Sequence, residues 1–389
     1  MTKKWSSRLT FFAFVVLMVG LGSNDSLRGI FSTIFQEHFS LTTTQLGLIV
    51  TASYIGNLVF LLVGGNLSTR FSKKRVLQVL ILIWMAALAL FAFTSNYTVL
   101  LIGMALALGS STLLNTTMNL ITPLLFATAP GFFVNFLFFT QEIGTSGSQY
   151  ILGSHADGFA FWQHTNLVLL ILGAVAFVLL LFCNVPEEAA APADAPAQKG
   201  GYDWRIIVPY VLVFGFYFIA EHGVMNWMVA YGVDGLGLPQ ASAAKYLSVF
   251  FGGMMIGRLC LSPLVDKLGA IKSLAAFGGV SCVLYLIGSL GGAVTMPVWA
   301  ISGLSFSILY PTLVMSIRLY FPAQQVSGAA GTILSIASLA DILFNVGFGK
   351  LVDMAGYAVS IRVLPLSVLA FFIVFMLFTK FCKPTQKLK

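Results

Sequence analysis

The chain has 389 residues, of which 58% are hydrophobic and only 9% are charged, and its mean hydropathy is +0.93. A soluble domain needs about a quarter of its residues charged to cover its surface, so this composition excludes a soluble protein and predicts an integral membrane protein. The net charge of +8 comes mostly from basic loops, and we infer no nucleic-acid partner from it.

Apolar runs of about 20 residues cross a bilayer as helices, because backbone groups must be hydrogen-bonded internally in hydrocarbon. The runs are continuous rather than alternating, which argues against a β-barrel. The prediction is an all-α membrane protein. Its twelve expected spans cover residues 9–34, 44–68, 76–94, 98–128, 131–154, 166–184, 205–231, 243–265, 272–292, 295–317, 326–350 and 360–381.

Basic residues mark one side of the predicted spans. They occur at the N-terminus, in the loops near residues 70–75 and 267–272, at Arg318 and in the C-terminal tail, whereas the opposite loops hold few of them. Because Lys and Arg accumulate in cytoplasmic loops, we expect a multi-pass protein of the cell (inner) membrane with both termini in the cytoplasm.

A polar stretch rich in Pro and Ala, residues 185–204, is typical of a flexible linker. It separates a six-helix bundle at 1–184 from a second at 205–389. Asp25 and Glu221 occupy similar places 196 residues apart, and comparable loops follow the second and eighth spans. Two pseudo-symmetric bundles of this kind form one plan of secondary transporters, with the substrate site between the halves.

The loop after the second span carries Gly65, Leu67 and Arg70, and the loop after the eighth carries Asp266 and Lys267. Their pattern resembles the G-x-L-x-D-R-x-G-R-R motif of the major facilitator superfamily, although Thr69 and Ser72 depart from it. The resemblance implies two bundles that alternate in access and a gating network on the cytoplasmic side. Its expected members are Arg70, Arg258, Asp266 and Lys267.

A narrower resemblance rests on the segments 114–119, 221–227 and 251–258, which are similar to the fucose/glucose–galactose:proton symporter branch. That branch has an acid where Asn115 stands, and Asp25 matches its first-helix acid. The resemblance implies proton-coupled import of a sugar by alternating access.

Charged side chains inside a membrane are costly and mark functional sites. Asp25, Glu142 and Asp341 are the expected proton-coupling residues. Asp25 and Arg28 are three residues apart on one helix face, which suits either a structural ion pair or a coupling site. Glu142 has no basic neighbour in sequence, so a protonated proton carrier and a neutral, hydrogen-bonded glutamate both remain open.

Further polar and aromatic residues in the spans are the expected substrate contacts, since sugars combine hydroxyls with apolar ring faces. For Trp227 a place in the aromatic belt at the membrane surface is an equal alternative. The expected substrate-binding residues are Asn115, Asn119, Gln141, Glu221, Asn226, Trp227 and Asn345.

Competing interpretations remain. Arg28 favours an organic-anion carrier, and the 35 phenylalanines favour a drug carrier, working by uniport, antiport or Na⁺ coupling; a non-transport membrane protein is a third class.

The histidines are dispersed and no catalytic or nucleotide-binding motif is present, so we expect no enzyme. The four scattered cysteines predict neither a metal site nor disulfides. We expect no cofactor, a small-molecule substrate, H⁺ or Na⁺ as coupling ion, and a functional monomer in the lipid bilayer.

Overall fold

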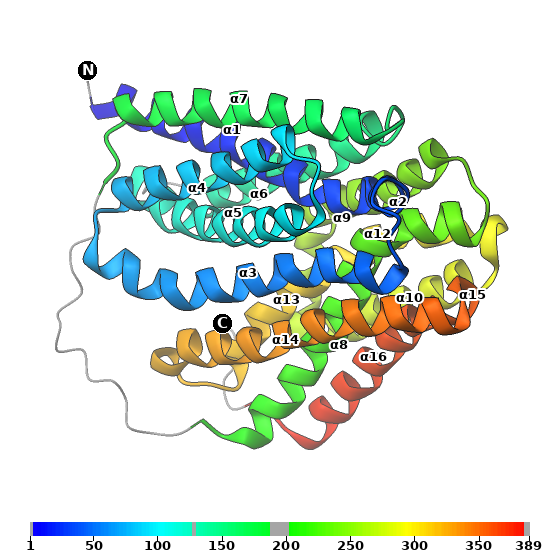
Figure 1. The fold of residues 1–389 in the computed structure, drawn as a ribbon. Coiled ribbons are helices and arrows are strands. Elements are labelled where there is room, and N and C mark those ends of the chain that lie inside the picture. The colour runs from blue at the N-terminus through cyan, green and yellow to red at the C-terminus, as the bar shows by residue number, and fades with distance from the viewer. Residues whose placement is uncertain (1–2, 127–129, 187–201, 385–389) are drawn as a thin grey trace. The chain divides into compact units, whose positions relative to one another are not determined.

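The computed structural model describes residues 3–126, 130–186 and 202–384, and the described chain is almost entirely helical (Figure 1). The chain divides into two compact units, residues 1–195 and 196–389. The boundary falls within the predicted linker 185–204, of which residues 187–201 lie outside the described part.

The first unit is a bundle of long helices that run side by side (Figure 1). α1 packs against α6, α3 against α5, and α4 against both α5 and α7. Ser72 and Asn96 cap α4 and α5 by accepting backbone N–H bonds. The helices are α1 (Lys3–Ile30), α2 (Ser32–His38), α3 (Thr43–Arg70), α4 (Lys73–Phe93), α5 (Tyr97–Leu125), α6 (Pro130–Ile151) and α7 (Phe159–Phe182).

In the second unit, α8 packs against both α14 and α16. The contact of α8 with α14 corresponds to that of α1 with α6, since each joins the first long helix of a unit to its fifth spanning element. The elements are α8 (Trp204–Ala230), η1 (Tyr231–Gly235), α9 (Gln240–Leu268), α10 (Ala270–Leu290), η2 (Gly292–Val294), α11 (Met296–Ile301), α12 (Gly303–Phe306), α13 (Leu309–Ser316), η3 (Ile317–Leu319), α14 (Ala323–Ala355), α15 (Tyr357–Ser360) and α16 (Val363–Phe381).

The tenth predicted span, 295–317, is not one continuous helix but the succession α11, α12 and α13. The hydroxyls of Ser302, Ser305 and Ser307 donate to carbonyls three residues earlier, and such bonds compete with regular helical pairing. A Cβ at Gly303 would lie 2.0 Å from the carbonyl oxygen of Phe250. The interrupted element therefore approaches α9 closely.

The ends of the first and last spans also differ from the prediction. The first spanning helix stops at Ile30, and the rest of the predicted range 9–34 belongs to the short helix α2. The twelfth range, 360–381, begins at the end of α15 and continues as α16. Hydropathy alone does not register these breaks, because the residues on both sides are apolar.

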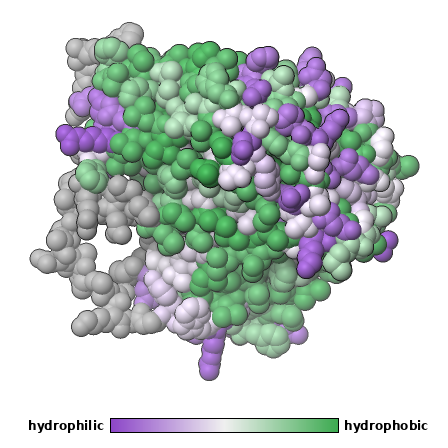
Figure 2. Space-filling view, in the orientation of Figure 1, coloured by the Kyte–Doolittle hydropathy of each residue, from purple (hydrophilic) through white to green (hydrophobic). Residues whose placement is uncertain are grey.

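Within the described residues, eleven segments are long and apolar enough to cross a membrane. α6 adds a helix of 22 residues, about 33 Å at 1.5 Å per residue and so long enough for the hydrocarbon core. On the face in Figure 2, hydrophobic residues cover the middle of the helices and hydrophilic residues gather toward their ends. The protein is a multi-pass, all-α membrane protein, as predicted.

Candidate functional site

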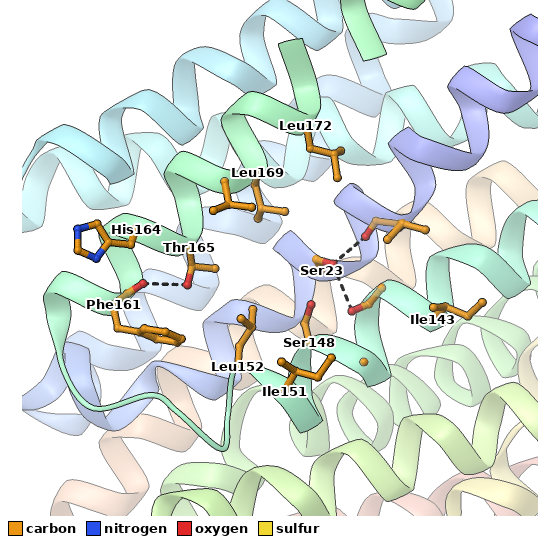
Figure 3. A pocket seen from close by; sticks show the side chains of 14 residues that line it. Ser23, Ile143, Ser148, Ile151, Leu152, Phe161, His164, Thr165, Leu169 and Leu172 are labelled. Carbon is orange, nitrogen blue, oxygen red and sulfur yellow. Dashed lines mark hydrogen bonds between the residues drawn. The ribbon is translucent and has the colours of Figure 1, made fainter. Parts of the chain in front are cut away.

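Two glycines hold α1 and α6 in close contact in the first unit. A Cβ at Gly22 would lie 2.0 Å from the carbonyl oxygen of Gln141, and one at Gly144 would lie 2.1 Å from that of Val19. The hydroxyl of Ser23 donates to the carbonyl of Gly144 over 3.3 Å, as Figure 3 shows. The register of α1 against α6 is therefore set at the level of the predicted polar residues.

Asp25 and Arg28 lie just beyond this contact, on the same face of α1. Nη1 of Arg28 is 3.9 Å from Oδ1 of Asp25, and the side chains are 5% and 17% exposed, respectively. The guanidinium lies over the ring of Tyr54 on α3, 5.9 Å from its centroid. Ser111 on α5 donates weakly to both carboxylate oxygens, at 3.4 and 3.5 Å. The pair predicted from the spacing is thus present, with neighbours from two further helices.

Three of the predicted substrate contacts form a chain of amides. Nδ2 of Asn119 donates to Oδ1 of Asn115 over 2.6 Å, and Nδ2 of Asn115 donates to Oε1 of Gln141 over 2.7 Å. Asn115 is four residues after Ser111, so both lie on one face of α5. Asp25, through Ser111, and the amide chain, through Asn115, therefore contact the same face of α5. Glu142 follows Gln141 on α6 and is partly buried.

The second unit contains a tight ionisable pair between α8 and α14. Nδ1 of His222 lies 2.8 Å from Oδ2 of Asp341. Asp341 is only 2% exposed and His222 is 24% exposed. The ring of Phe218 stacks on the imidazole, with centroids 5.4 Å apart and planes at 7°. A buried carboxylate is thus paired with a partly accessible histidine.

A second link between the same helices lies one turn further along. Nε1 of Trp227 donates to Oδ1 of Asn345 over 2.8 Å, and Nδ2 of Asn345 donates to the backbone carbonyl of Asp341. Trp227 is fully buried, and Asn226 is 2% exposed. A place for Trp227 in the aromatic belt at the membrane surface is therefore wrong. In this structure Trp227 orients Asn345.

Glu221 and Arg258 approach one aromatic cluster from different helices. Both act electrostatically on Tyr217 and Tyr310, whose ring centroids are 5.8 Å apart. Tyr217 is buried. The acid of α8 and the base of α9 therefore face the same pair of phenols inside the second unit.

The other predicted gating residues lie at the ends of α3 and α9. Lys267 is exposed. The side chains of Arg70 and Asp266 lie outside the described part of the structure, so their place in a gate stays a prediction.

Neither of two grooves in the first unit suits a polar solute. The groove in Figure 3 has a volume of about 510 Å³ and lies between α1, α6 and α7, with mostly apolar walls such as Ile143, Leu169 and Leu172. A second groove of about 950 Å³, near Val59 and Leu82, is also mainly apolar. Among the described residues, no group of three or more His, Cys, Asp and Glu side chains could hold a metal ion.

Sequence reasoning missed His222, which it treated as one of several dispersed histidines. The available signal was an ionisable residue within a predicted span, which is itself a functional indication. The offset of 196 residues between Asp25 and Glu221 would also place Glu142 opposite Ser338 in the repeat, and the packing differs from this. Gln141 lies opposite Gly22, and Asp341 opposite His222, and both pairs are 119 residues apart. Asp341 therefore corresponds to Gln141.

Comparisons with known proteins agree with this architecture. The family model of the Major Facilitator Superfamily matches residues 10–343. The chain is 24% identical over 333 residues to the L-fucose-proton symporter of Escherichia coli (strain K12), covering 74% of this chain and 75% of the relative. It is also 24% identical over 297 residues to the cis,cis-muconate transport protein of Acinetobacter baylyi (strain ATCC 33305 / BD413 / ADP1), covering 71% and 70%.

Among solved structures, the D-xylose-proton symporter superposes with a TM-score of 0.77 at 16% identity, covering 98% of each chain. This likeness concerns the fold. The relatives are carriers rather than enzymes, which confirms the prediction that this protein is not an enzyme. The family match spans most of the chain. It includes the polar residues around Asp25 in the first unit and the His222–Asp341 pair in the second, but not Asn345. The protein belongs to the Major Facilitator Superfamily of membrane transporters.

Proposed function

We propose that this transporter imports a small polar solute, by preference a sugar, together with a proton. The observation that carries the proposal is the cluster of Asp25, Ser111, Asn115, Asn119 and Gln141 on three apolar helices of the first unit. Amides and hydroxyls on apolar helices suit a solute with many hydroxyl groups, because each can both donate and accept hydrogen bonds. A symporter of L-fucose among the relatives supports the same substrate class.

Three carboxylates are the proposed proton carriers: Asp25, Glu142 and Asp341. A carboxylate that crosses low-dielectric surroundings moves more readily when a proton neutralises it. Asp341 has His222 at 2.8 Å, so the imidazole is placed to pass a proton to the carboxylate in this scheme. Binding a proton and the solute together, and releasing both on the other side, would couple solute uptake to the proton gradient.

The remaining predicted residues receive supporting roles in this proposal. Glu221, Asn226 and Asn345, with Trp227 behind Asn345, would complete the solute contacts in the second unit. Arg70, Arg258, Asp266 and Lys267 would close the cytoplasmic side. The positive-inside distribution of Lys and Arg supports cytoplasmic termini in the cell membrane, and a single chain would transport as a monomer.

An organic-anion carrier is the second candidate, and the relative that transports cis,cis-muconate favours it. Counterflow in liposomes separates the two candidates. Purified protein is reconstituted with an unlabelled solute inside, and exchange for the labelled solute outside is measured. Exchange of hexoses or of their sugar acids supports the proposal, whereas exchange of organic acids that carry no sugar hydroxyls, such as a dicarboxylate, without exchange of any sugar or sugar acid contradicts it.

The proton step has its own test. Replacing Glu142 with Gln should abolish accumulation driven by a pH gradient and leave exchange intact, because the amide cannot carry a proton. Glu37→Gln, at an exposed position on α2, is the matched control. Unchanged accumulation in E142Q would remove Glu142 from the coupling role, and a Na⁺ requirement without pH dependence would refute proton coupling.

A further inference from the structure

The guanidinium of Arg28 has a charge partner, but in the described part of the chain its Nε lacks a hydrogen-bond acceptor. The side chain is 5% exposed, and its Nη1 is 3.9 Å from Asp25, which is too long for a hydrogen bond. Its Nε is buried and has no hydrogen-bond partner among the described residues. An arginine presents five donors in a planar fork. Burying Nε without an acceptor costs free energy, and the described side chains provide no acceptor for it.

The surroundings balance the charge of Arg28 without supplying an acceptor to its Nε. The ring of Tyr54, 5.9 Å from the guanidinium, contributes a cation–π attraction. Asp25 contributes a negative charge, and it also accepts the two long bonds from Ser111. An arginine held in this way is ready to form a closer pair if a better-placed anion arrives.

We propose that the solute carries a carboxylate beside its hydroxyl groups, as a uronic or aldonic acid does, and that Arg28 is its counter-charge. This rests on the proposed function and narrows its substrate class. The guanidinium fork binds a carboxylate through two parallel hydrogen bonds. Such a pair would satisfy donors that Asp25 does not reach at 3.9 Å.

The rest of the solute would extend along α5. Ser111, which contacts Asp25, and Asn115, which begins the amide chain, are four residues apart, or about 6 Å along the helix. Asn119 has a buried Oδ1 without a hydrogen-bond partner in the described structure. With its carboxylate at Arg28, a six-carbon acid would direct its hydroxyls along α5 toward Asn115, the first amide of the chain.

The charges then balance through one proton. A proton from the outer solution binds the carboxylate of Asp25, which becomes neutral and releases Arg28. The solute carboxylate takes the place beside the guanidinium, and on the cytoplasmic side the solute leaves and Asp25 returns its proton to water. One proton moves with one monoanion, so the cycle carries no net charge.

Counterflow with matched solutes tests the substrate class on the unaltered protein. Galactose, galacturonate and the methyl ester of galacturonate differ mainly at one carbon. We expect exchange of galacturonate to be at least about tenfold faster than that of the other two, because only the acid forms the charge-assisted pair. A pH gradient should drive its accumulation, and a membrane potential imposed alone should not.

Substitutions at Arg28 supply the second readout. Arg28→Gln should lose acid exchange, and Arg28→Lys should retain part of it with a raised KM, since lysine keeps the charge but not the fork. Arg8→Gln, at an exposed position on the same helix, is the control. Thermal unfolding in detergent identifies variants that fail to fold, and the solute comparison needs no variant.

The outcomes separate this inference from the function on which it rests. Proton-driven exchange of galactose that equals or exceeds that of galacturonate overturns the carboxylate inference and leaves sugar symport standing. Exchange of galacturonate without any pH dependence supports Arg28 as its counter-charge and refutes proton coupling. Exchange of none of the three solutes overturns both proposals.

Discussion

Removing the imidazole of His222 should destabilise the second unit, because it leaves the carboxylate of Asp341 buried without the ring that pairs with it. Asp341 is 2% exposed, and its second oxygen, Oδ1, is already without a hydrogen-bond partner among the described residues. Breaking a buried ion pair costs about 3–5 kcal/mol. His222 is 24% exposed, so water can replace part of the lost contact. We therefore expect His222→Ala to lower the free energy of unfolding by about 2–3 kcal/mol.

A double-mutant cycle in detergent micelles measures the pair itself. Asp341→Asn removes the charge that His222 compensates, so H222A should cost much less in the D341N background, with a coupling energy of about 1–3 kcal/mol. His164→Ala, at an exposed position on α7, should change stability little. Effects of H222A and D341N that add within about 0.5 kcal/mol would refute a direct interaction.

Three further predictions follow from individual contacts. Gly22→Ala should destabilise the first unit by about 1–3 kcal/mol, because the new Cβ meets a backbone oxygen at 2.0 Å, whereas Gly147→Ala, with open space around it, should be neutral or stabilising in the same thermal unfolding assay. Asn115→Asp adds a carboxylate to the amide chain, so the pH profile of solute exchange should gain a titration step, and an unchanged profile contradicts a place for Asn115 in the site. Trp227→Phe removes the bond to Asn345 and should cost about 1 kcal/mol in stability; weaker solute binding without lost stability would instead indicate direct contact with the solute.

In the candidate site, the residue pattern predicted contacts within one helix but not contacts between helices. The spacing of Asp25 and Arg28 predicted their pairing, because three residues on a helix bring side chains to one face. Nothing local predicted that Tyr54 and Ser111 would join them from two other helices. The same holds for the chain of amides. Its residue types predicted a polar site, but the hydrogen-bond partners of each amide depend on how α5 packs against α6.

The sequence by itself determined that the protein is helical and embedded in a membrane, since the cost of placing residues in lipid is close to a sum over residues. Tertiary structure alone decided that His222 meets Asp341, that Trp227 is buried against Asn345, and that the tenth span is broken. These outcomes depend on contacts such as that between α8 and α14, whose residues are more than a hundred positions apart. The free energy of such contacts resides in pairs, and only the packing of the helices determines which pairs form.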